Sequence, residues 1–322
     1  MLPPRARKPL LLAGQQRQWA AYQAHLPFDL PLNPRSTVPS AMTDSDLDSP
    51  LAALVRRYDH DRYLTTLFAP AAARPALFAI AAFNHELAKT REVVSEAMLG
   101  EIRLQWWSDA VGECFAGSPR RHEVVTPLAE AIQRFGLDRA PFDRMIEARR
   151  FDLGDSAPPD LNALESYCAD TAGAVVMLGL QVLGVEDPDS HEAARHVGIA
   201  YGLTGLLRAV PFHAQDRRVY LPTQVVEAVA ADMGGLFDLK PHEGLERAVA
   251  ALASTAANHL RLARRIKGLS KSARTGLLVG RLAQTYLGAL RRAGHNVFDA
   301  RVQTPPPWRQ LTLTAAALTG RF

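Results

Sequence analysis

From Ser49-Pro50 onward, apolar residues recur every three to four positions, and no segment shows sustained alternation of apolar and polar residues. The observed period is typical of amphipathic helices, whereas alternation would indicate strands. Serine is a favoured helix N-cap and proline a favoured first helical residue, so the first helix should begin at Pro50. Glycines and prolines separate the periodic segments. The expected helices span residues 50–69, 75–94, 98–116, 124–135, 141–152, 161–183, 190–209, 222–231, 244–267 and 272–293.

This succession of helices predicts an all-α fold, with a single helical domain over residues 49–303. The chain has 322 residues, which is enough for one large helical domain. Residues 1–48 form an N-terminal tail in this interpretation. The prolines at 305–307 end the regular region, so residues 304–322 are expected to form a C-terminal tail. The apolar run 311–318 within it should dock back onto the domain.

The surplus of positive charge lies in the first 41 residues, and the rest of the chain is formally neutral. A nucleic-acid-binding protein would carry its basic surface on the folded domain, so no nucleic-acid partner is expected. The segment is either a mitochondrial-type targeting sequence or a disordered tail ahead of a start at Met42. The composition, rich in Ala, Arg and Pro, is typical of a GC-rich bacterial gene and favours the second. Its charged residues are Arg5, Arg7, Lys8, Arg17, Asp29 and Arg35.

Cysteine usage and hydropathy bear on the compartment. Cys114 and Cys168 are the only two cysteines, and such isolated thiols fit a reducing compartment better than a disulfide framework. The longest apolar run, residues 171–185, contains Gln181 and is too short to span a bilayer, so it predicts a buried helix. The apolar run 10–13 is too brief for a secretory signal peptide. We therefore expect a cytoplasmic protein.

The most distinctive stretch is residues 205–222, GLLRAVPFHAQDRRVYLP. It resembles the second aspartate-rich segment of squalene/phytoene synthases, LRDxxxDxxxGRVYLP, in register and without a gap. Ala209 and His213 stand where that family has its two aspartates. Magnesium is bound through oxygen ligands, above all carboxylates. The stretch therefore keeps the surroundings of a magnesium–diphosphate site without the groups that would hold the metal.

The first aspartate-rich segment of the same family, DDxxD, aligns with Ala88, Lys89 and Glu92 when the chain is matched from Arg74. On one helix, His85, Lys89 and Glu92 would form a single stripe. Lys89 would repel a metal ion there and pair with Glu92 instead. The plain interpretation of these two residues is an i, i+3 ion pair on the surface of the helix. The residues of this degenerate first motif are Asn84, His85, Glu86, Ala88, Lys89 and Glu92.

Pro211 should disturb the second segment further. An interior proline removes a helix hydrogen bond and clashes with the preceding turn, at a cost of about 3 kcal/mol, so the helix should end near Ala209. Positions 209 and 213 would then not lie side by side, and restoring both aspartates alone would not rebuild the site. The residues of this degenerate second motif are Tyr201, Thr204, Arg208, Ala209, His213, Arg217, Arg218 and Tyr220.

The arginines of the second motif have two interpretations. Arg208, Arg217 and Arg218 can bind a phosphate or another anion, because guanidinium groups match such oxygens bidentately. They can equally pair with acids of the same segment, such as Asp216 and Glu227.

The other polar residues give weaker signals. Tyr201 and Thr204 share a helix face with Arg208 and should border the pocket. His213 is a candidate metal ligand or general base, but no carboxylate adjoins it in sequence, which is more typical of a loop or cap histidine. His196 lies five residues after another histidine, a spacing that does not place two ligands on one helix face.

Four stretches resemble the complex I assembly factors of the squalene/phytoene synthase-like family. They are AFNHELAKTREVVSE (82–96), GEIRLQWW (100–107), ESYCADTAG (165–173) and residues 205–222. The resemblance implies an isoprenoid-synthase-type fold without the aspartate-rich motifs, and a role in building respiratory NADH:quinone oxidoreductase. Complex I subunits or assembly intermediates would be the partners. The location would be the inner face of the cytoplasmic membrane in a bacterium, or the mitochondrial matrix at the inner membrane in a eukaryote.

Three functions follow from these observations. The first is a non-catalytic assembly protein whose helical pocket holds a lipid or isoprenoid tail, with Lys89, Arg91 and Arg208 available for an anionic head group. The second is a magnesium-dependent prenyltransferase that condenses two isoprenoid diphosphates, although Glu92 alone remains of the acids that would bind the metal. The third is a protein whose basic tail binds an anionic membrane surface. We expect no cofactor, with Mg²⁺ required only by the second.

Overall fold

The structure is a computed structural model that describes Leu47, residues 49–94 and residues 96–322. The two interpretations of residues 1–41 concern a segment outside the described residues. Over the described ranges the chain forms helices and no strand, which confirms the all-α prediction. No helix in that part of the chain is both long and apolar enough to cross a bilayer.

The expected helices are present, and several are divided in two. The first half contains α2 (Pro50–Tyr58), α3 (His60–Thr66), the short η2 (Ala71–Ala73), α4 (Arg74–Ala88), α5 (Thr90–Val93), α6 (Ala97–Phe115), α7 (Val125–Phe135), α8 (Arg139–Arg150) and the short η3 (Phe151–Leu153). The second half contains α9 (Leu161–Cys168), the π-helical turn η4 (Ala169–Gly173), α10 (Ala174–Val182), α11 (Pro188–Gln215), α12 (Thr223–Ala228), α13 (Met233–Phe237), α14 (Glu243–Arg265), α15 (Lys271–Gly276), α16 (Val279–Arg292), α17 (Ala300–Gln303) and α18 (Arg309–Thr319). The sequence pattern predicts no helix at the positions of η2, α13, α17 and α18.

Side-chain caps explain where the first helices begin. The Ser49 hydroxyl accepts a hydrogen bond from the Ala52 amide at 3.2 Å, as predicted for the start of α2. The Asp59 carboxylate accepts one from the Arg62 amide at 3.1 Å and begins α3. The expected single helix over 50–69 is therefore two helices, because Asp59 satisfies the free amides of a new helix start.

Helix α11 continues through Pro211 to Gln215, so the prediction that it ends near Ala209 is wrong. Leu207, Val210 and Ala214, on both sides of the proline, are all buried in one apolar cluster. Burying each large apolar side chain contributes about 1.5–3 kcal/mol, so their packing offsets the cost of the proline. Positions 209 and 213 consequently lie one turn apart on the same helix.

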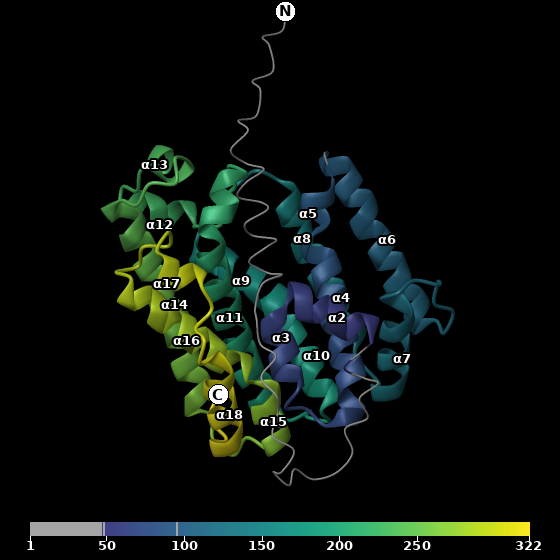
Figure 1. Cartoon of the computed structure of the whole chain (residues 1–322). Coiled ribbons are helices and arrows are strands. Elements are labelled where there is room, and N and C mark those ends of the chain that lie inside the picture. The colour runs from purple at the N-terminus through teal and green to yellow at the C-terminus, as the bar shows by residue number, and fades with distance from the viewer. Residues whose placement is uncertain (1–46, 48, 95) are drawn as a thin grey trace, which may run out of the picture. The chain divides into compact units, whose positions relative to one another are not determined.

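In Figure 1 the long helix α11 lies between α4, α6, α7 and α8 on one side and α12, α14 and α16 on the other. It crosses η4 at Gly198 and Gly173. A Cβ atom added to Gly198 would lie 2.2 Å from the Gly173 Cα atom, so only glycine allows this approach of the two backbones. Apolar residues of α4 and α10 form a second core on the side of α6, α7 and α8.

The C-terminal segment docks onto the domain, as predicted for residues 311–318. Leu313 of α18 is fully buried beside Leu282 of α16. At the start of α18, Arg309 forms a buried ion pair with Asp61 of α3 at 2.8 Å. The Tyr286 hydroxyl donates a hydrogen bond to the same carboxylate at 2.7 Å. The helix is thus held by both apolar packing and a desolvated ion pair.

We expect Arg309→Ala to lower the free energy of unfolding by about 3–5 kcal/mol, because it leaves the buried Asp61 carboxylate without its main cation. The matched control is Arg139→Ala, which breaks an exposed ion pair with Asp143 and should cost less than about 1 kcal/mol. Urea denaturation of both variants measures the difference. Equal effects of the two substitutions would contradict the role given to the buried pair.

Candidate functional site

The first motif lies at a break between two helices. Helix α4 ends at Ala88, and the Lys89 amide closes it with a hydrogen bond to the His85 carbonyl at 3.0 Å. Glu92 belongs to the separate α5. His85, Lys89 and Glu92 therefore do not share one helical stripe, which corrects the geometry expected from the sequence.

Glu86 is the acid that pairs with Lys89, so the predicted Lys89–Glu92 pair is wrong. The Glu86 side chain is 6% exposed, and its carboxylate accepts hydrogen bonds from Lys89 and, at 2.7 Å, from Arg103 of α6. A buried carboxylate needs such partners. Two positive charges of this chain thus neutralise the one buried acid of the first motif.

The other residues of the first motif make structural contacts. The His85 ring stacks on Tyr58 with ring centroids 4.5 Å apart. The buried Asn84 amide oxygen accepts a hydrogen bond from Arg149 of α8 at 3.5 Å. Ala88 is partly buried and, as an alanine, supplies no polar group. None of these three residues supplies a carboxylate.

Asp152, in η3, is the polar centre beside the second motif, and the sequence analysis missed it. Its carboxylate accepts hydrogen bonds from the Tyr220 hydroxyl at 2.7 Å and from the Tyr167 hydroxyl at 2.9 Å. Arg149 forms an ion pair with it at 3.1 Å. Burial is the main cause that raises the pKa of Tyr167 and Tyr220, and the charge of Asp152 adds to it. Both hydroxyls are therefore protonated donors.

His213 lies against this centre. Its ring is 4.6 Å from the Tyr220 ring, centroid to centroid. Burial, with the positive charge of Arg218, lowers the pKa of His213 to about 4, and Asp152 opposes the shift. Among the described residues, no group forms a hydrogen bond with its Nδ1 atom. His213 is thus a neutral, half-buried residue of the last turn of α11, where its carbonyl accepts the capping amide of Asp216; of the loop or cap position expected from the sequence, it occupies the second.

Glu92 brings the two motifs together. The residue is exposed, and partial desolvation, followed by the negative charge of Asp216, raises the pKa of its carboxyl. The positive charges of Arg218 and Lys89 act in the opposite direction. These electrostatic partners place the end of α5 close to the end of α11, as the alignment with two facing motifs requires.

The arginines of the second motif contact aromatic rings and backbone oxygens. The Arg208 guanidinium lies 3.9 Å from the Tyr286 ring centroid, and that of Arg217 lies 4.8 Å from the Phe237 ring centroid. Arg218 donates to the Asp152 carbonyl oxygen at 2.6 Å. In the described ranges none of the three forms an ion pair with a carboxylate, so the pairing considered with Asp216 or Glu227 is absent there.

Tyr201 and Thr204 lie further along the α11 face. The Tyr201 hydroxyl donates to Asp61 at 3.5 Å, and the Arg62 guanidinium lies 5.1 Å from the Tyr201 ring centroid. The Thr204 hydroxyl is buried and donates to the Ala200 carbonyl at 2.7 Å. Tyr201 therefore joins α11 to the Asp61–Arg309 pair, whereas Thr204 only satisfies its own helix.

These residues do not fit a magnesium–diphosphate site. Of the positions aligned with the family's aspartates, Glu92 alone carries a carboxylate, and Lys89 and Arg218 stand beside it. Across the part of the chain that the structure describes, no group of three or more His, Cys, Asp or Glu residues is arranged to hold a metal ion. Magnesium requires several oxygen ligands, which this arrangement does not supply.

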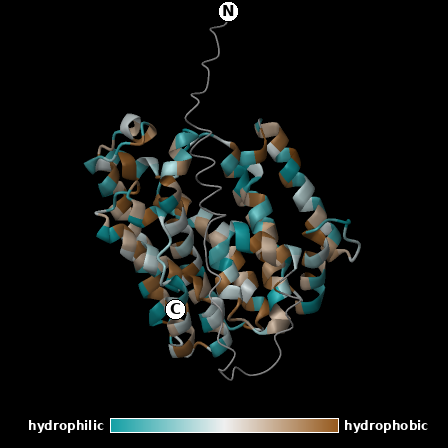
Figure 2. Cartoon of the chain, in the orientation of Figure 1, coloured by the Kyte–Doolittle hydropathy of each residue, from teal (hydrophilic) through white to brown (hydrophobic). Residues whose placement is uncertain are grey.

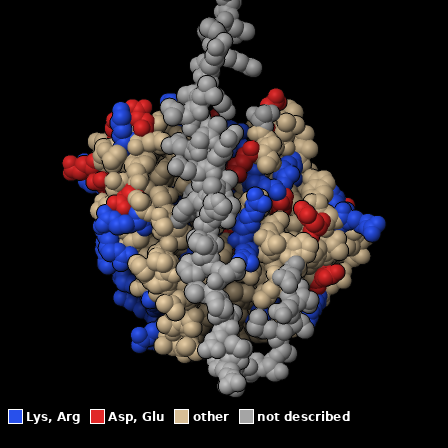
Figure 3. Space-filling view, viewed as in Figure 1, with Lys and Arg blue, Asp and Glu red and all other residues tan. Residues whose placement is uncertain are grey.

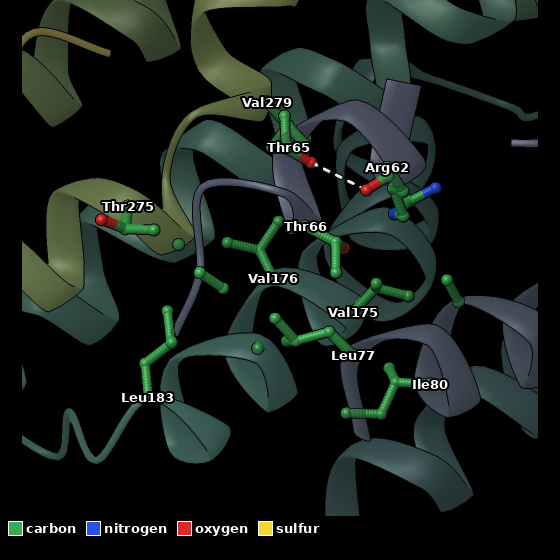
Figure 4. A pocket seen from close by; sticks show the side chains of 14 residues that line it. Arg62, Thr65, Thr66, Leu77, Ile80, Val175, Val176, Leu183, Thr275 and Val279 are labelled. Atoms are coloured by element: carbon green, nitrogen blue, oxygen red, sulfur yellow. Dashed lines mark hydrogen bonds between the residues drawn. The ribbon is translucent and has the colours of Figure 1, made fainter. Parts of the chain in front are cut away.

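An apolar cavity lies below the motifs, between α3, α4, α10 and α15 (Figure 4). Ile80, Val175 and Val279 line it, and Arg62 lies at one end, with no residue of either motif in its wall. Its volume is about 60 Å³, whereas sites for drug-sized ligands measure roughly 300–1,000 Å³. As it stands, the cavity cannot hold the isoprenoid tail considered from the sequence.

A row of four polar residues joins α9, α11 and α14. The Nδ1 atoms of His196 and His259 lie 2.8 Å apart. The Nε2 atoms face Glu192 at 3.0 Å and Glu165 at 3.3 Å, respectively. Because the facing Nδ1 atoms share one hydrogen, one ring donates and the other accepts. No local sequence pattern predicts this row, because His259 lies on a different helix from His196.

The fold and these contacts define a helical protein of the isoprenoid-synthase type. Residues 55–308 match the family described as squalene/phytoene synthase. The chain therefore belongs to the squalene/phytoene synthase family. The match to the structure of a dehydrosqualene synthase covers 86% of this chain and 96% of the synthase chain, with a TM-score of 0.75 and 21% identity. A squalene synthase from Alicyclobacillus acidocaldarius gives a TM-score of 0.69 at 22% identity, with 78% and 95% covered.

Curated relatives of two kinds match. NADH dehydrogenase (ubiquinone) complex I assembly factor 6 of Bos taurus is 29% identical over 265 residues, which cover 82% of this chain and 80% of the relative. The protein of that name from Rattus norvegicus is 32% identical over 251 residues, covering 78% and 75%. The 15-cis-phytoene synthase of Synechococcus elongatus is 27% identical over 279 residues, covering 82% and 90%.

We expect His213→Gln to weaken the acid sensitivity of the fold. The folded-state pKa of about 4 lies below the unfolded value of about 6.5, so folding favours the neutral ring. Its contribution to stability is complete above pH 6.5 and is lost as pH falls toward 4. Between pH 7 and 4.5 the variant should lose about 1–2 kcal/mol less than the parent. Urea unfolding across this pH range measures it, and identical pH profiles would contradict the assignment.

Proposed function

We propose that this protein is a non-catalytic member of its family that assists the assembly of respiratory complex I. The charge at the two motif positions carries the proposal. Ala88, Lys89, Ala209 and His213 stand at positions where the resemblance expects acids. A prenyltransferase must neutralise the diphosphate leaving group with metal ions, and these side chains cannot gather them.

The relatives support the same choice. Proteins named complex I assembly factor 6 match over more than three quarters of this chain at 29–32% identity. The match to a phytoene synthase is similar in coverage and lower in identity. Complex I subunits or assembly intermediates are accordingly the proposed partners. The proposed location is the inner face of the respiratory membrane, which faces the cytoplasm in a bacterium and the matrix in a mitochondrion.

The proposal includes no metal cofactor and no lipid in the apolar cavity. The buried acids that could attract a cation already have arginine or lysine partners, as Glu86 and Asp152 illustrate. The cavity volume of about 60 Å³ leaves no room for a prenyl tail without rearrangement. The proposed function therefore rests on surfaces that contact other proteins, and not on metal-assisted chemistry or on a ligand in this cavity.

Removal of the gene from its respiring host should lower NADH:quinone oxidoreductase activity severalfold, while carotenoid and hopanoid levels stay unchanged. In parallel, the tagged full chain should co-purify complex I subunits, which an equally tagged unrelated protein should not. Enzyme activity in isolated membranes and quantitative mass spectrometry measure these outcomes. Normal complex I activity together with a change in isoprenoid products would contradict the proposal.

A further inference from the structure

The first turns of α6 and the adjoining end of α5 expose large apolar side chains. Met98 is 71% exposed, Ile102 60%, Val93 56% and Leu99 46%. We call these four residues the α6 patch. The upper end of α6 is correspondingly brown in Figure 2. Scattered exposed apolar residues are ordinary, but a contiguous group is typical of an interaction surface.

Two charged residues of the same turns pair with other helices of the domain. Arg103 donates to the buried Glu86 at 2.7 Å, and Glu101 pairs with Arg150 of α8. A surface helix normally turns its apolar stripe inward and its charges outward. At this end of α6 the arrangement is partly reversed, and the apolar residues are those left toward solvent.

The charge around the α6 patch indicates which partner fits it. Over residues 96–115, Arg103 is the one basic residue, and its guanidinium faces Glu86. Glu96 and Asp109 are exposed, and the Glu101 side chain is 45% exposed. In Figure 3 this end of the surface is mostly tan, with red side chains nearby and blue ones on the side that faces α5. The exposed acids of α6 itself, Asp109 and the N-cap Glu96, favour a partner with lysines or arginines over an anionic membrane surface.

We propose that the α6 patch binds an amphipathic helix of a partner protein. The helix would cover Met98, Leu99 and Ile102 with its apolar stripe, and place basic residues beside Glu96 and Asp109. Helices bind apolar surfaces in this way through side chains one turn apart. The inference rests on the proposed function, in which the partner belongs to complex I or to one of its assembly intermediates.

The outer face of α18 provides a matched control. Leu311 and Leu318 are 74% and 83% exposed. They lie on the outer face of α18, whereas the buried Leu313 lies on the face that packs against the domain. No acidic or basic residue borders them within α18 except Arg309, which faces Asp61. Nothing in the structure indicates what would cover this face. Substitutions there change exposed apolar area without touching the α6 patch.

The test uses two labelled helical peptides with the same apolar stripe, one flanked by lysines and the other by glutamates. Fluorescence anisotropy with the full chain should show about tenfold tighter binding of the lysine peptide. The double variant Met98→Gln/Ile102→Gln should lose binding about tenfold, because exposed glutamines keep the helix but remove the apolar contact. The control Leu311→Gln/Leu318→Gln should bind as the parent does. Glu96→Gln/Asp109→Asn should reduce the preference for lysine.

Three results would overturn the inference. The first is equal binding of both peptides, and the second is unchanged binding by Met98→Gln/Ile102→Gln. The third is binding to phosphatidylglycerol vesicles that this variant abolishes, since that would make the occupant a membrane.

Co-purification separates the inference from the proposed function. If the parent captures complex I subunits, the patch variant should capture severalfold less and the α18 control should match the parent. Equal capture by the patch variant would overturn the inference and leave the proposed function intact. If the parent captures none, the proposed function fails, and the peptide measurements alone decide whether the α6 patch binds a basic amphipathic helix.

Discussion

The buried carboxylates of this protein are neutralised by its own arginines and lysines, and much of the structure depends on that pairing. Asp61 forms an ion pair with Arg309 and thereby fixes α18 to α3. Glu86 holds Lys89 and Arg103 and joins α4 to α6. Asp152 holds Arg149 and two tyrosine hydroxyls beside α11. A desolvated carboxylate without such partners would cost several kcal/mol, so each pair fixes the position of the helices that supply it.

The same pairing is the physical basis of the proposal that this chain keeps its family's fold without its family's chemistry. Helix α11 remains continuous through Pro211, and Glu92 still lies close enough to Asp216 and Arg218 for their charges to shift its pKa. The two motif segments thus keep their positions. The charges of Lys89 and Arg218 act on Glu92 between the two segments, and the proposed loss of metal-assisted chemistry rests on them. A scaffold of this kind is available for contacts with other proteins.

The sequence was sufficient for the elements whose causes are local. Helical periodicity and the Ser49 cap placed the start of α2 correctly, and the apolar run 311–318 indicated that α18 docks. The path of α11 could not be predicted, because the local cost of Pro211 is outweighed by burial of Leu207, Val210 and Ala214 against distant helices. Local rules also misplaced the partner of Lys89. Helix α4 ends at Ala88, so the Lys89 ammonium pairs with Glu86 and not with Glu92.

Much of the candidate site depends on residues that are remote in sequence. Asp152 meets Tyr220 across 68 positions, and His196 meets His259 across 63; neither pair has a local pattern that would reveal it. The motif alignment found the correct region because it compares whole segments, but it could not show which charges compensate one another. Burial and pairing are properties of the folded chain.

The account is tested most directly by incubating the purified full chain with farnesyl or geranylgeranyl diphosphate and Mg²⁺, beside an active squalene synthase as the assay control. The pairing of interior acids with protein cations predicts neither a condensed prenyl product nor release of diphosphate. Magnesium-dependent product that disappears in Glu92→Gln would contradict the account, because it would mean that the one remaining motif acid still supports metal-assisted ionisation.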